Sequence, residues 1–258
     1  MTAAIVLEDL SKSFGEFVAV DRVSFSVPEG QVFGFMGHNG AGKTTTIRML
    51  LGLTRPTGGR ARVLGRDVVA ENLAVRGLCG FLPASYGLPR DMSAIEFLAY
   101  VGAMFGLSRA EATRRGRELL ELFELTAVAG KPLGGFSTGM AQKVGLAQAL
   151  IGRPRVLFLD EPTSGLDPLG RHHFLTHIRG LAREQGVTVL FSTHILGDVE
   201  SICEQVAIMH HGRLIACGAL QALKAEHRAA SMDDLYLELV QAAPTTKQAA
   251  PTTKRGAA

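Results

Sequence analysis

The sequence predicts an α/β fold, in which a helical subdomain is inserted between the strands of a parallel sheet. Three observations lead to this prediction. Short apolar runs typical of strands lie in both halves of the chain, a stretch with the 3.6-residue period of helices separates them, and the strand pattern returns after it. With 258 residues, of which 47% are hydrophobic, the chain can bury a substantial core.

The first 87 residues contain most of the predicted strands. Two runs alternate apolar and polar side chains, and in the second of them Val23, Phe25 and Val27 share one face. A further apolar run leads into a glycine-rich loop and then a helical stretch, within which Gly52 is the residue expected to end the helix. The predicted strands are residues 4–10, 22–27, 31–36, 61–65 and 78–83, the helix covers residues 47–53, and residues 54–60 form a loop.

After Pro83 the period changes from that of strands to that of helices. Ser93 followed by Glu96 matches the capping box that begins a helix, and Ser108 followed by Glu111 repeats it. Each box precedes apolar residues at helical spacing. These residues therefore predict a helical block.

The strand pattern returns in residues 155–160 and 187–193, both apolar runs typical of strands buried on two faces. A turn at residues 210–212 predicts a hairpin, and helices follow it. The last residues are rich in Ala, Thr and Pro, so we expect them to be disordered. The predicted division is a core of residues 1–87 and 153–218, a helical subdomain of residues 88–152, C-terminal helices in residues 219–240, and a disordered tail of residues 241–258.

The charge balance argues against a nucleic-acid-binding surface. The net charge of +3 equals the charge of Lys247, Lys254 and Arg255, because residues 241–258 contain no acidic residue, and the rest of the chain is formally neutral. No apolar run approaches the ~18 residues of a membrane span. Three cysteines without a C-x-x-C spacing argue against a disulfide framework, so we expect a reducing compartment.

Residues 37–44 match the GxxxxGK[ST] pattern of a phosphate-binding loop. The motif follows an apolar strand and opens a helix, which is the placement that its chemistry requires. Its glycines let backbone N–H groups point at phosphate oxygens, and the helix N-terminus adds partial positive charge. Lys43 can reach the β- and γ-phosphates, and the Thr44 hydroxyl can ligate Mg²⁺. The sequence therefore predicts a P-loop NTPase core that binds a nucleoside triphosphate.

Residues 156–161 supply the expected partner of this loop. Four apolar residues precede Asp160, which therefore lies at the end of a predicted buried strand. There its carboxylate can hold the Mg²⁺ ion and its water shell. Glu161 comes next and could polarise an attacking water. A nucleotide-dependent switch would need only Asp160, so Glu161 favours hydrolysis.

A second anion-binding position is predicted at the start of another helix. Ser137 and Gly139 precede the helix that ends before Pro154, and a helix N-terminus favours phosphate. One triphosphate cannot occupy two helix termini of a compact domain unless the termini converge, and two copies of the chain would bring them together. Residues 164–167 read Ser-Gly-Leu-Asp, and His194 ends the strand of residues 187–193. A lone histidine at a strand end is more often structural, but His194 lies where a γ-phosphate contact is needed.

In this order, over residues 4–217, the motifs resemble those of the ATP-binding subunit of an ABC transporter. The resemblance implies two copies packed head to tail, with each ATP between the phosphate loop of one copy and the Ser137 region of the other. It also implies an integral membrane permease as partner and a peripheral location on the cytoplasmic face of the membrane. The implied fold is a P-loop NTPase core with a mixed sheet, antiparallel strands at the N-terminus and an inserted helical subdomain. It implies that Glu161 is the general base and that His194 contacts the γ-phosphate. The implied Mg²⁺ ligands are Thr44 and Asp160, and the implied ATP contacts are Phe14 (by stacking on adenine), Gly37, His38, Asn39, Gly40, Ala41, Gly42, Lys43, Thr44, Thr45, Ser137, Gly139 and, at the dimer interface, Asp167.

Two departures from the family pattern stand out. Ala84 occupies a position where the family often has Gln, and a methyl group cannot ligate Mg²⁺, so a water or Ser85 must substitute. Residues 136–140 read FSTGM where LSGGQ is commonest, yet Ser137 and Gly139 are kept. The sequences of residues 136–140 and 231–239 resemble those of the ATP-binding subunits that pair with ABC-2-type permeases, which are usually exporters.

Several features have simpler interpretations. Without the resemblance, Phe14 would be interpreted as a core residue. His172, His173, His177, His210 and His211 lack a fixed carboxylate or cysteine partner in the sequence, so metal binding by them is not the favoured interpretation.

Two other functions compete with transport. A soluble ATPase of the same fold could act on nucleic acid or ribosomes, but this chain has neither a second nucleotide domain nor a basic body. A small-molecule kinase would use the phosphate loop, but it would leave Ser137, Gly139 and residues 164–167 unexplained.

Overall fold

The computed structural model describes residues 2–243 and contains two sheets. The smaller sheet is antiparallel, with the order β2-β1-β4-β5, and the larger has the order β10-β9-β3-β8-β7-β6. In the larger sheet all neighbours are parallel except β9 and β10, so the sheet is mixed as predicted. The strands are β1 (Ala3–Phe14), β2 (Phe17–Pro28), β3 (Val32–Met36), β4 (Gly58–Val63), β5 (Arg66–Asp67), β6 (Cys79–Leu82), β7 (Val156–Asp160), β8 (Thr188–Thr193), β9 (Gln205–His210) and β10 (Arg213–Ala219).

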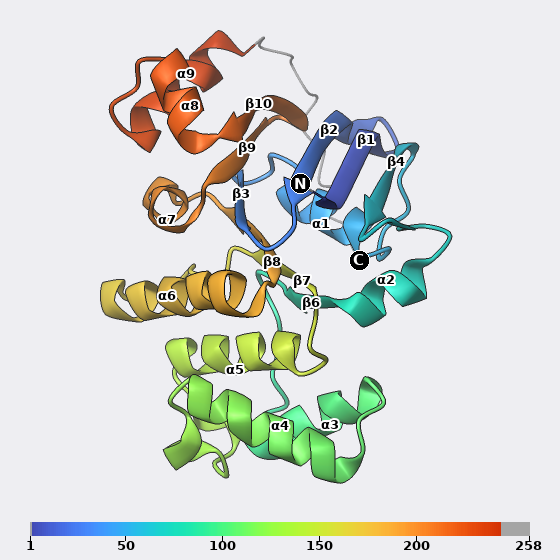
Figure 1. Cartoon of the computed structure of the whole chain (residues 1–258), viewed down its shortest axis with the longest axis vertical. Coiled ribbons are helices and arrows are strands. Elements are labelled where there is room, and N and C mark those ends of the chain that lie inside the picture. Colours follow the sequence, from blue (N-terminus) through green and yellow to red (C-terminus); the bar gives the residue numbers. More distant parts are fainter. Residues whose placement is uncertain (1, 244–258) are drawn as a thin grey trace, which may run out of the picture.

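Helices cover both faces of the larger sheet. The first helix lies between the two sheets, and the fifth, sixth and seventh lie on the opposite face (Figure 1). The helices are α1 (Lys43–Leu50), α2 (Asn72–Leu78), α3 (Ala94–Met104), α4 (Arg109–Leu122), α5 (Thr138–Leu150), α6 (Pro168–Gln185), α7 (Leu196–Ile202), α8 (Leu220–Glu226) and α9 (Met232–Ala242).

Two apolar cores follow from this layering. Phe25 of β2 stacks on Phe33 of β3 with ring centroids 5.5 Å apart, and together with α1 these strands fill the space between the sheets. The opposite face of β3, β7 and β8 packs against α5, α6 and α7. Because β3, β7 and β8 are buried on both faces, their sequences are continuous apolar runs rather than alternating ones.

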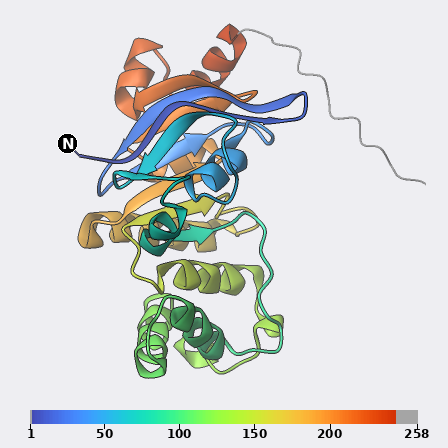
Figure 2. The ribbon, with the colours of Figure 1, turned by 90° about the vertical axis from the view of Figure 1, so that its right-hand side faces the viewer.

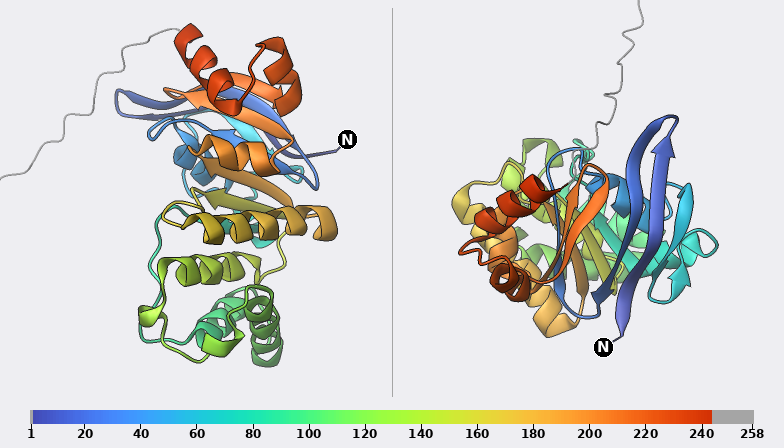
Figure 3. Two further views of the ribbon diagram at one scale, coloured as in Figure 1. Left: turned by 90° about the vertical axis from the view of Figure 1, so that its left-hand side faces the viewer. Right: turned by 90° about the horizontal axis from the view of Figure 1, so that it is seen from above.

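The helices α3, α4 and α5 lie at the end of the molecule remote from β1 and β2 (Figure 2). Both predicted capping boxes are confirmed: Ser93 begins α3 with Glu96, and Ser108 begins α4 with Glu111. At the other end, α8 and α9 lie on one side of the β9–β10 hairpin, with β1 and β2 on the other (Figure 3). The division of the chain into a core, a helical subdomain and C-terminal helices stays a prediction.

The structure corrects three details of the sequence prediction. Helix α9 runs to Ala242, so the predicted disordered tail starts too early, and residues 244–258 of that tail lie outside the described residues. Residues 58–60 belong to β4 rather than to a loop, because β4 pairs with β1. Helix α2 was not predicted, since Val75 is its one buried residue and a single apolar position gives no period.

Candidate active site

Three predicted functional segments meet at one edge of the larger sheet. The strands β3, β8 and β7 are parallel neighbours in that order, with Met36 opposite Thr193 and Asp160 opposite Ser192. The carboxyl ends of these strands therefore lie side by side. Each is followed by a segment singled out from the sequence: the phosphate loop after β3, Glu161 after β7, and His194 after β8.

The phosphate loop adopts a conformation that requires glycine at two positions. Gly37 and Gly42 have φ values of 152° and 104°, which L side chains rarely adopt. A Cβ atom on Gly37 would lie 2.4 Å from the Met209 carbonyl oxygen, and one on Gly42 would lie 2.6 Å from the Ala19 carbonyl oxygen. The loop is thus packed closely against β9 and β2. Asn39 and Gly40 are exposed at its tip, whereas Gly37 and Ala41 are buried and His38, Gly42, Thr44 and Thr45 are partly buried.

Lys43 is held inside the loop. Its ammonium group donates to the carbonyl oxygen of Gly37 at 2.6 Å and to that of His38 at 3.3 Å. It also lies 3.0 Å from Glu161 Oε1, which accepts no hydrogen bond within the described residues. The Lys43 side chain is 6% exposed, so this ion pair is largely shielded from water. The structure thus places the cation of the phosphate loop against the carboxylate that follows β7.

Asp160 is fixed by two hydroxyl groups. Thr44 Oγ1 donates to Asp160 Oδ2 at 2.7 Å, and Ser192 Oγ donates to Asp160 Oδ1 at 2.6 Å. Asp160 and Ser192 are buried, 1% and 0% exposed. The predicted pair Thr44 and Asp160 is therefore in direct contact. Ser192 was missed by the sequence analysis, although its place at the end of the apolar run of β8 was a usable signal.

Glu161 and His194 are also in contact. His194 Nδ1 lies 2.6 Å from Glu161 Oε2, and because a carboxylate can only accept, this ring nitrogen is the donor. The backbone N–H of His194 points at the same oxygen at 3.3 Å. Glu161 has a φ of 51°, a conformation uncommon for a residue with a side chain. Strained residues of this kind concentrate at functional sites.

Ser137 and Gly139 lie away from these groups. They stand at the start of α5, which packs on the face of the larger sheet opposite to α1 (Figure 1). Ser137 caps α5 by accepting a hydrogen bond from the Met140 N–H at 3.3 Å, and a Cβ atom on Gly139 would lie 3.7 Å from Leu166. Asp167 caps α6, accepting from the Gly170 N–H at 2.7 Å. The structure therefore groups Ser137, Gly139 and Asp167 together, and it does not bring them to the phosphate loop of the same chain.

Phe14 is exposed at the end of β1. It is 53% exposed, with Lys12 Nζ 4.9 Å from its ring centroid. The interpretation of Phe14 as a core residue is therefore wrong. Ala84 and Ser85 follow β6 and are exposed, at the rim of a cavity of about 460 Å³ that also borders Phe136 and Thr138.

A chain of hydrogen bonds that the sequence analysis missed links α5 to the segment after Glu161. Tyr86 Oη donates to the Ala141 carbonyl oxygen at 2.8 Å and lies 3.0 Å from Gln142 Oε1. Gln142 Nε2 donates to the Pro162 carbonyl oxygen at 2.5 Å. Burial raises the pKa of the Tyr86 phenol, so this group stays a donor. The start of α5 is thus hydrogen-bonded both to the loop after β6 and to the residue that follows Glu161.

Comparisons with known proteins agree with this geometry. Residues 20–164 match the family model described as ABC transporter. The chain is 44% identical to the ABC transporter ATP-binding protein YxlF of Bacillus subtilis (strain 168), over 86% of this chain and 73% of the relative. It is 37% identical to the Nod factor export ATP-binding protein I of Rhizobium sp. (strain N33), over 90% of this chain and 76% of the relative.

The fold agrees as well. A solved structure of an ATP-binding subunit of an ABC transporter superposes with a TM-score of 0.83 and 33% identity, covering 93% of this chain and all of the other. Within residues 2–243, none of the helices is both long enough and apolar enough to cross a membrane. The family model, the relatives and the site geometry agree, and the chain belongs to the ABC transporter family as an ATP-binding, ATP-hydrolysing subunit.

Proposed function

We propose that this chain powers export through a separate membrane permease, with two copies of the chain sharing two ATP molecules. The observation that carries the catalytic part is the convergence of Lys43, Thr44, Asp160, Glu161 and His194 at one sheet edge. The site roles that follow are part of this proposal.

The triphosphate binds to the loop of residues 37–45. Its backbone N–H groups and the N-terminus of α1 stabilise phosphate oxygens, and Lys43 supplies a full positive charge. Lys43 is paired with Glu161, so a phosphate must compete with that carboxylate for the ammonium group. Phe14 offers an exposed aromatic face on which an adenine can stack.

The oxygen donors beside the loop suit Mg²⁺. The Thr44 hydroxyl and the Asp160 carboxylate are hard oxygen ligands in mutual contact, which matches the preference of this ion. When bound, Mg²⁺ neutralises charge on the phosphates. Ser192 holds the Asp160 carboxylate in orientation from its buried side, as groups behind metal ligands commonly do.

Glu161 acts as the general base. Its carboxylate accepts a proton from water as the water oxygen attacks the γ-phosphorus and the bond from that phosphorus to the ADP oxygen breaks. His194 fixes Glu161 through its Nδ1–H. Its Nε2 would donate to a γ-phosphate oxygen in the doubly protonated ring, because in the neutral ring with Nδ1–H this atom carries a lone pair. Release of Lys43 to the phosphate frees Glu161 Oε1 for the water.

A second copy of the chain completes each site. Ser137 and Gly139 at the N-terminus of α5 form an anion-binding position that faces away from the phosphate loop of their own chain. Head-to-tail pairing would place them over the phosphate loop of the partner. Asp167 sits beside them at the start of α6 and would line this interface.

Export is supported by the name of the Nod factor export relative. An ABC-2-type permease as partner and a peripheral place on the cytoplasmic face of the membrane are part of this proposal and are supported by the resemblance of residues 136–140 and 231–239 to that group. The formally neutral body of the chain favours this role over action on nucleic acid.

The purified chain tests the proposal directly. It should release inorganic phosphate from MgATP and should co-purify with a membrane protein from its native membranes. Transfer of phosphate to an acceptor in place of free phosphate would favour a kinase instead. Salt-sensitive binding to DNA or RNA at physiological ionic strength would favour the nucleic-acid role.

A further inference from the structure

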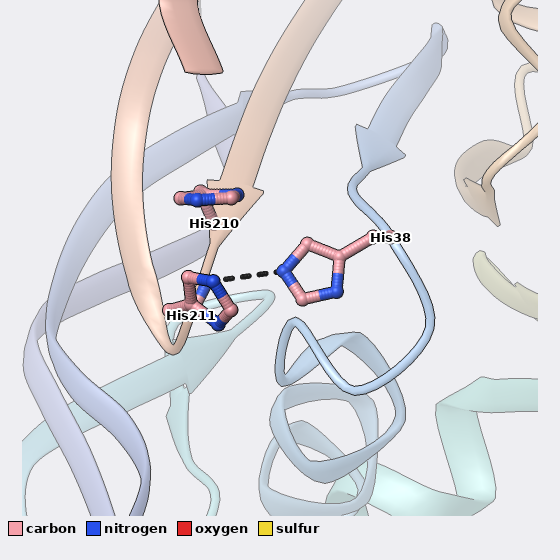
Figure 4. Close-up of side chains that lie close together, drawn as sticks. All are labelled: His38, His210 and His211. Atoms are coloured by element: carbon pink, nitrogen blue, oxygen red, sulfur yellow. Dashed lines mark hydrogen bonds between the residues drawn. The ribbon is translucent and has the colours of Figure 1, made fainter. Parts of the chain in front are cut away.

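Three histidines from distant parts of the chain meet beside the phosphate loop. His38 belongs to the loop, His210 ends β9, and His211 forms the turn between β9 and β10 (Figure 4). One ring nitrogen of each lies within 4.8 Å of the others. The centroids of the His38 and His211 rings are 4.7 Å apart, and those of the His38 and His210 rings 5.0 Å apart. We propose that these three imidazoles form a binding site for a divalent transition-metal ion of the zinc type, and that this ion ties the phosphate loop to the β9–β10 hairpin.

The tautomer of His38 suits a metal ligand. Its Nδ1 lies 2.8 Å from the carbonyl oxygen of Asn39, and because a carbonyl can only accept, Nδ1 carries the proton. Nε2 therefore carries the lone pair and faces the hairpin, where it accepts a hydrogen bond from the His211 backbone N–H at 3.4 Å, a bond that a metal ion would replace. Histidines that ligate metals almost always donate their other ring N–H to a carbonyl or carboxylate in this way.

His210 supplies a ring nitrogen with no other use within the described part of the chain. Its Nδ1 atom is buried and has no hydrogen-bond partner there, which is costly for a polar atom.

The hairpin holds the two neighbouring histidines in place. Residues His211 and Gly212 have φ values of 46° and 79°, as the central pair of a two-residue type I′ turn requires. The Gly212 N–H donates to the Ala41 carbonyl oxygen at 3.1 Å, so the turn is already bonded to the phosphate loop. Nitrogen ligands about 2.0–2.1 Å from a tetrahedral ion lie roughly 3.4 Å apart, so the exposed His211 ring turns inward to close the site.

The chemistry separates this site from the predicted Mg²⁺ site. Imidazole nitrogens suit Zn²⁺, Cu²⁺ or Ni²⁺, whereas Mg²⁺ prefers oxygen ligands such as Thr44 and Asp160. The sequence analysis did not favour metal binding by His210 and His211, because the proposed third ligand, His38, lies 173 positions away from His211 in the sequence.

The ion would act on a part of the loop that nucleotides need. The His38 carbonyl oxygen accepts from the Ala41 N–H at 3.0 Å and from Lys43 Nζ at 3.3 Å. Fixing the His38 ring therefore restrains the backbone that positions Lys43. We expect bound metal to slow hydrogen exchange of the amides in residues 37–42 and at the hairpin turn.

The test uses the full chain without a histidine tag and without nucleotide. Cys217 is exposed and could bind zinc itself, so Cys217→Ser is the parent. Zn²⁺ is titrated against a chelating indicator dye, and the parent should bind one ion per chain. His211→Asn should weaken binding at least about tenfold. This variant keeps the hairpin, because Asn tolerates positive φ and Asn followed by Gly is favoured in such turns.

A second variant and a matched control complete the design. His210→Gln should weaken Zn²⁺ binding by a similar factor, and circular dichroism reports whether either variant is folded. A variant combining His172→Gln with His173→Gln on α6 should bind as the parent does, since these exposed rings lie on another element. Binding by the parent that His211→Asn and His210→Gln leave unchanged, or no binding at all, would overturn the proposal and leave only a cluster of imidazoles in edge-on contact.

Discussion

Lys43 Nζ and Glu161 Oε1 lie 3.0 Å apart, in an ion pair whose two side chains are only 6% and 13% exposed. The cation that would hold the phosphates and the carboxylate that would activate water are therefore bound to each other. Removing one partner of such a pair leaves the other charge buried and unpaired, which costs about 3–5 kcal/mol. In the proposed mechanism, nucleotide binding and the freeing of the base would thus be a single exchange of partners at Lys43.

Lys43→Ala should abolish measurable ATP binding and should destabilise the fold by several kcal/mol, about 3–5, because Glu161 loses its counter-charge. Adding Glu161→Gln should restore most of the stability but none of the ATP binding. Urea unfolding and calorimetric nucleotide titration measure the two effects. The control is Lys143→Ala, which breaks a surface pair with Glu124 and should cost less than about 1 kcal/mol. Equal stability losses in the two lysine variants would argue against a shielded pair at Lys43.

Glu161→Gln should slow ATP hydrolysis at least tenfold and by up to the ~10²–10⁴-fold that general bases contribute, while ATP binding is kept. The amide keeps the size of the side chain but cannot accept the proton from water. The rate of phosphate release measures ATP hydrolysis, and calorimetric nucleotide titration measures the affinity for ATP. Glu124→Gln is the matched control, because Glu124 is an exposed partner of Lys143. Undiminished turnover in Glu161→Gln would remove this residue as the base.

Ser192→Ala should raise the Mg²⁺ concentration needed for half-maximal hydrolysis by about 10–100-fold. The loss leaves Asp160 Oδ1 without the hydroxyl that orients it. Hydrolysis at saturating Mg²⁺ should change much less, since Thr44 and Asp160 remain. The comparison variant is Ser201→Ala, whose hydroxyl donates only to a backbone oxygen in α7. A lower rate with an unchanged Mg²⁺ requirement would speak against the orienting role.

Ser93→Ala should destabilise α3 by about 1 kcal/mol, because Ser93 caps this helix through the Glu96 N–H.

The hydroxyl and the backbone N–H of Ser93 both donate to the Glu96 carboxylate, and these bonds lower the pKa of Glu96 below its usual 4.5. A lowered carboxyl pKa contributes stability that is complete above 4.5 and is lost as the pH falls through the lowered pKa. The gap in unfolding free energy between the wild type and Glu96→Gln should therefore shrink from pH 7 to pH 3. A gap that stays constant would contradict the charged cap.

The parts of the site whose residues are consecutive in the sequence could be predicted. The phosphate loop, the Asp160–Glu161 pair and the capping boxes of α3 and α4 each need a short pattern next to an apolar or helical run. Parallel pairing then brings the ends of β3, β7 and β8 together. The mixed sheet and the antiparallel N-terminal strands were expected only from the family resemblance, because the apolar runs by themselves indicate a parallel sheet.

The remaining features depend on contacts between distant residues. Ser192 is 32 positions from Asp160, and His38 is 173 positions from His211, so no local pattern shows that the two members of either pair are in contact. The bond from Gln142 to Pro162 likewise depends on how α5 packs. Helix α2 was missed because one buried residue gives no period. Phe14, apolar by type, lies at the exposed end of β1, and residue type alone cannot tell such a position from the core.

The central claim is that the Ser137–Gly139 turn of one copy closes the phosphate loop of the other, and Gly139→Ala tests it most directly. A Cβ atom at Gly139 has 3.7 Å of clearance to Leu166, so the single chain accommodates it, whereas a phosphate approaching the α5 N-terminus would meet it. Gly135→Ala is the matched control, because a Cβ atom there meets nothing within 4 Å.

Light scattering of the Glu161→Gln protein with MgATP gives the mass of the particle that forms. We predict twice the mass of one chain for Glu161→Gln alone and with Gly135→Ala, and the mass of one chain when Gly139→Ala is added. A Glu161→Gln protein that holds MgATP yet stays at the mass of one chain, or a Gly139→Ala protein that pairs as well as its control, would contradict the account.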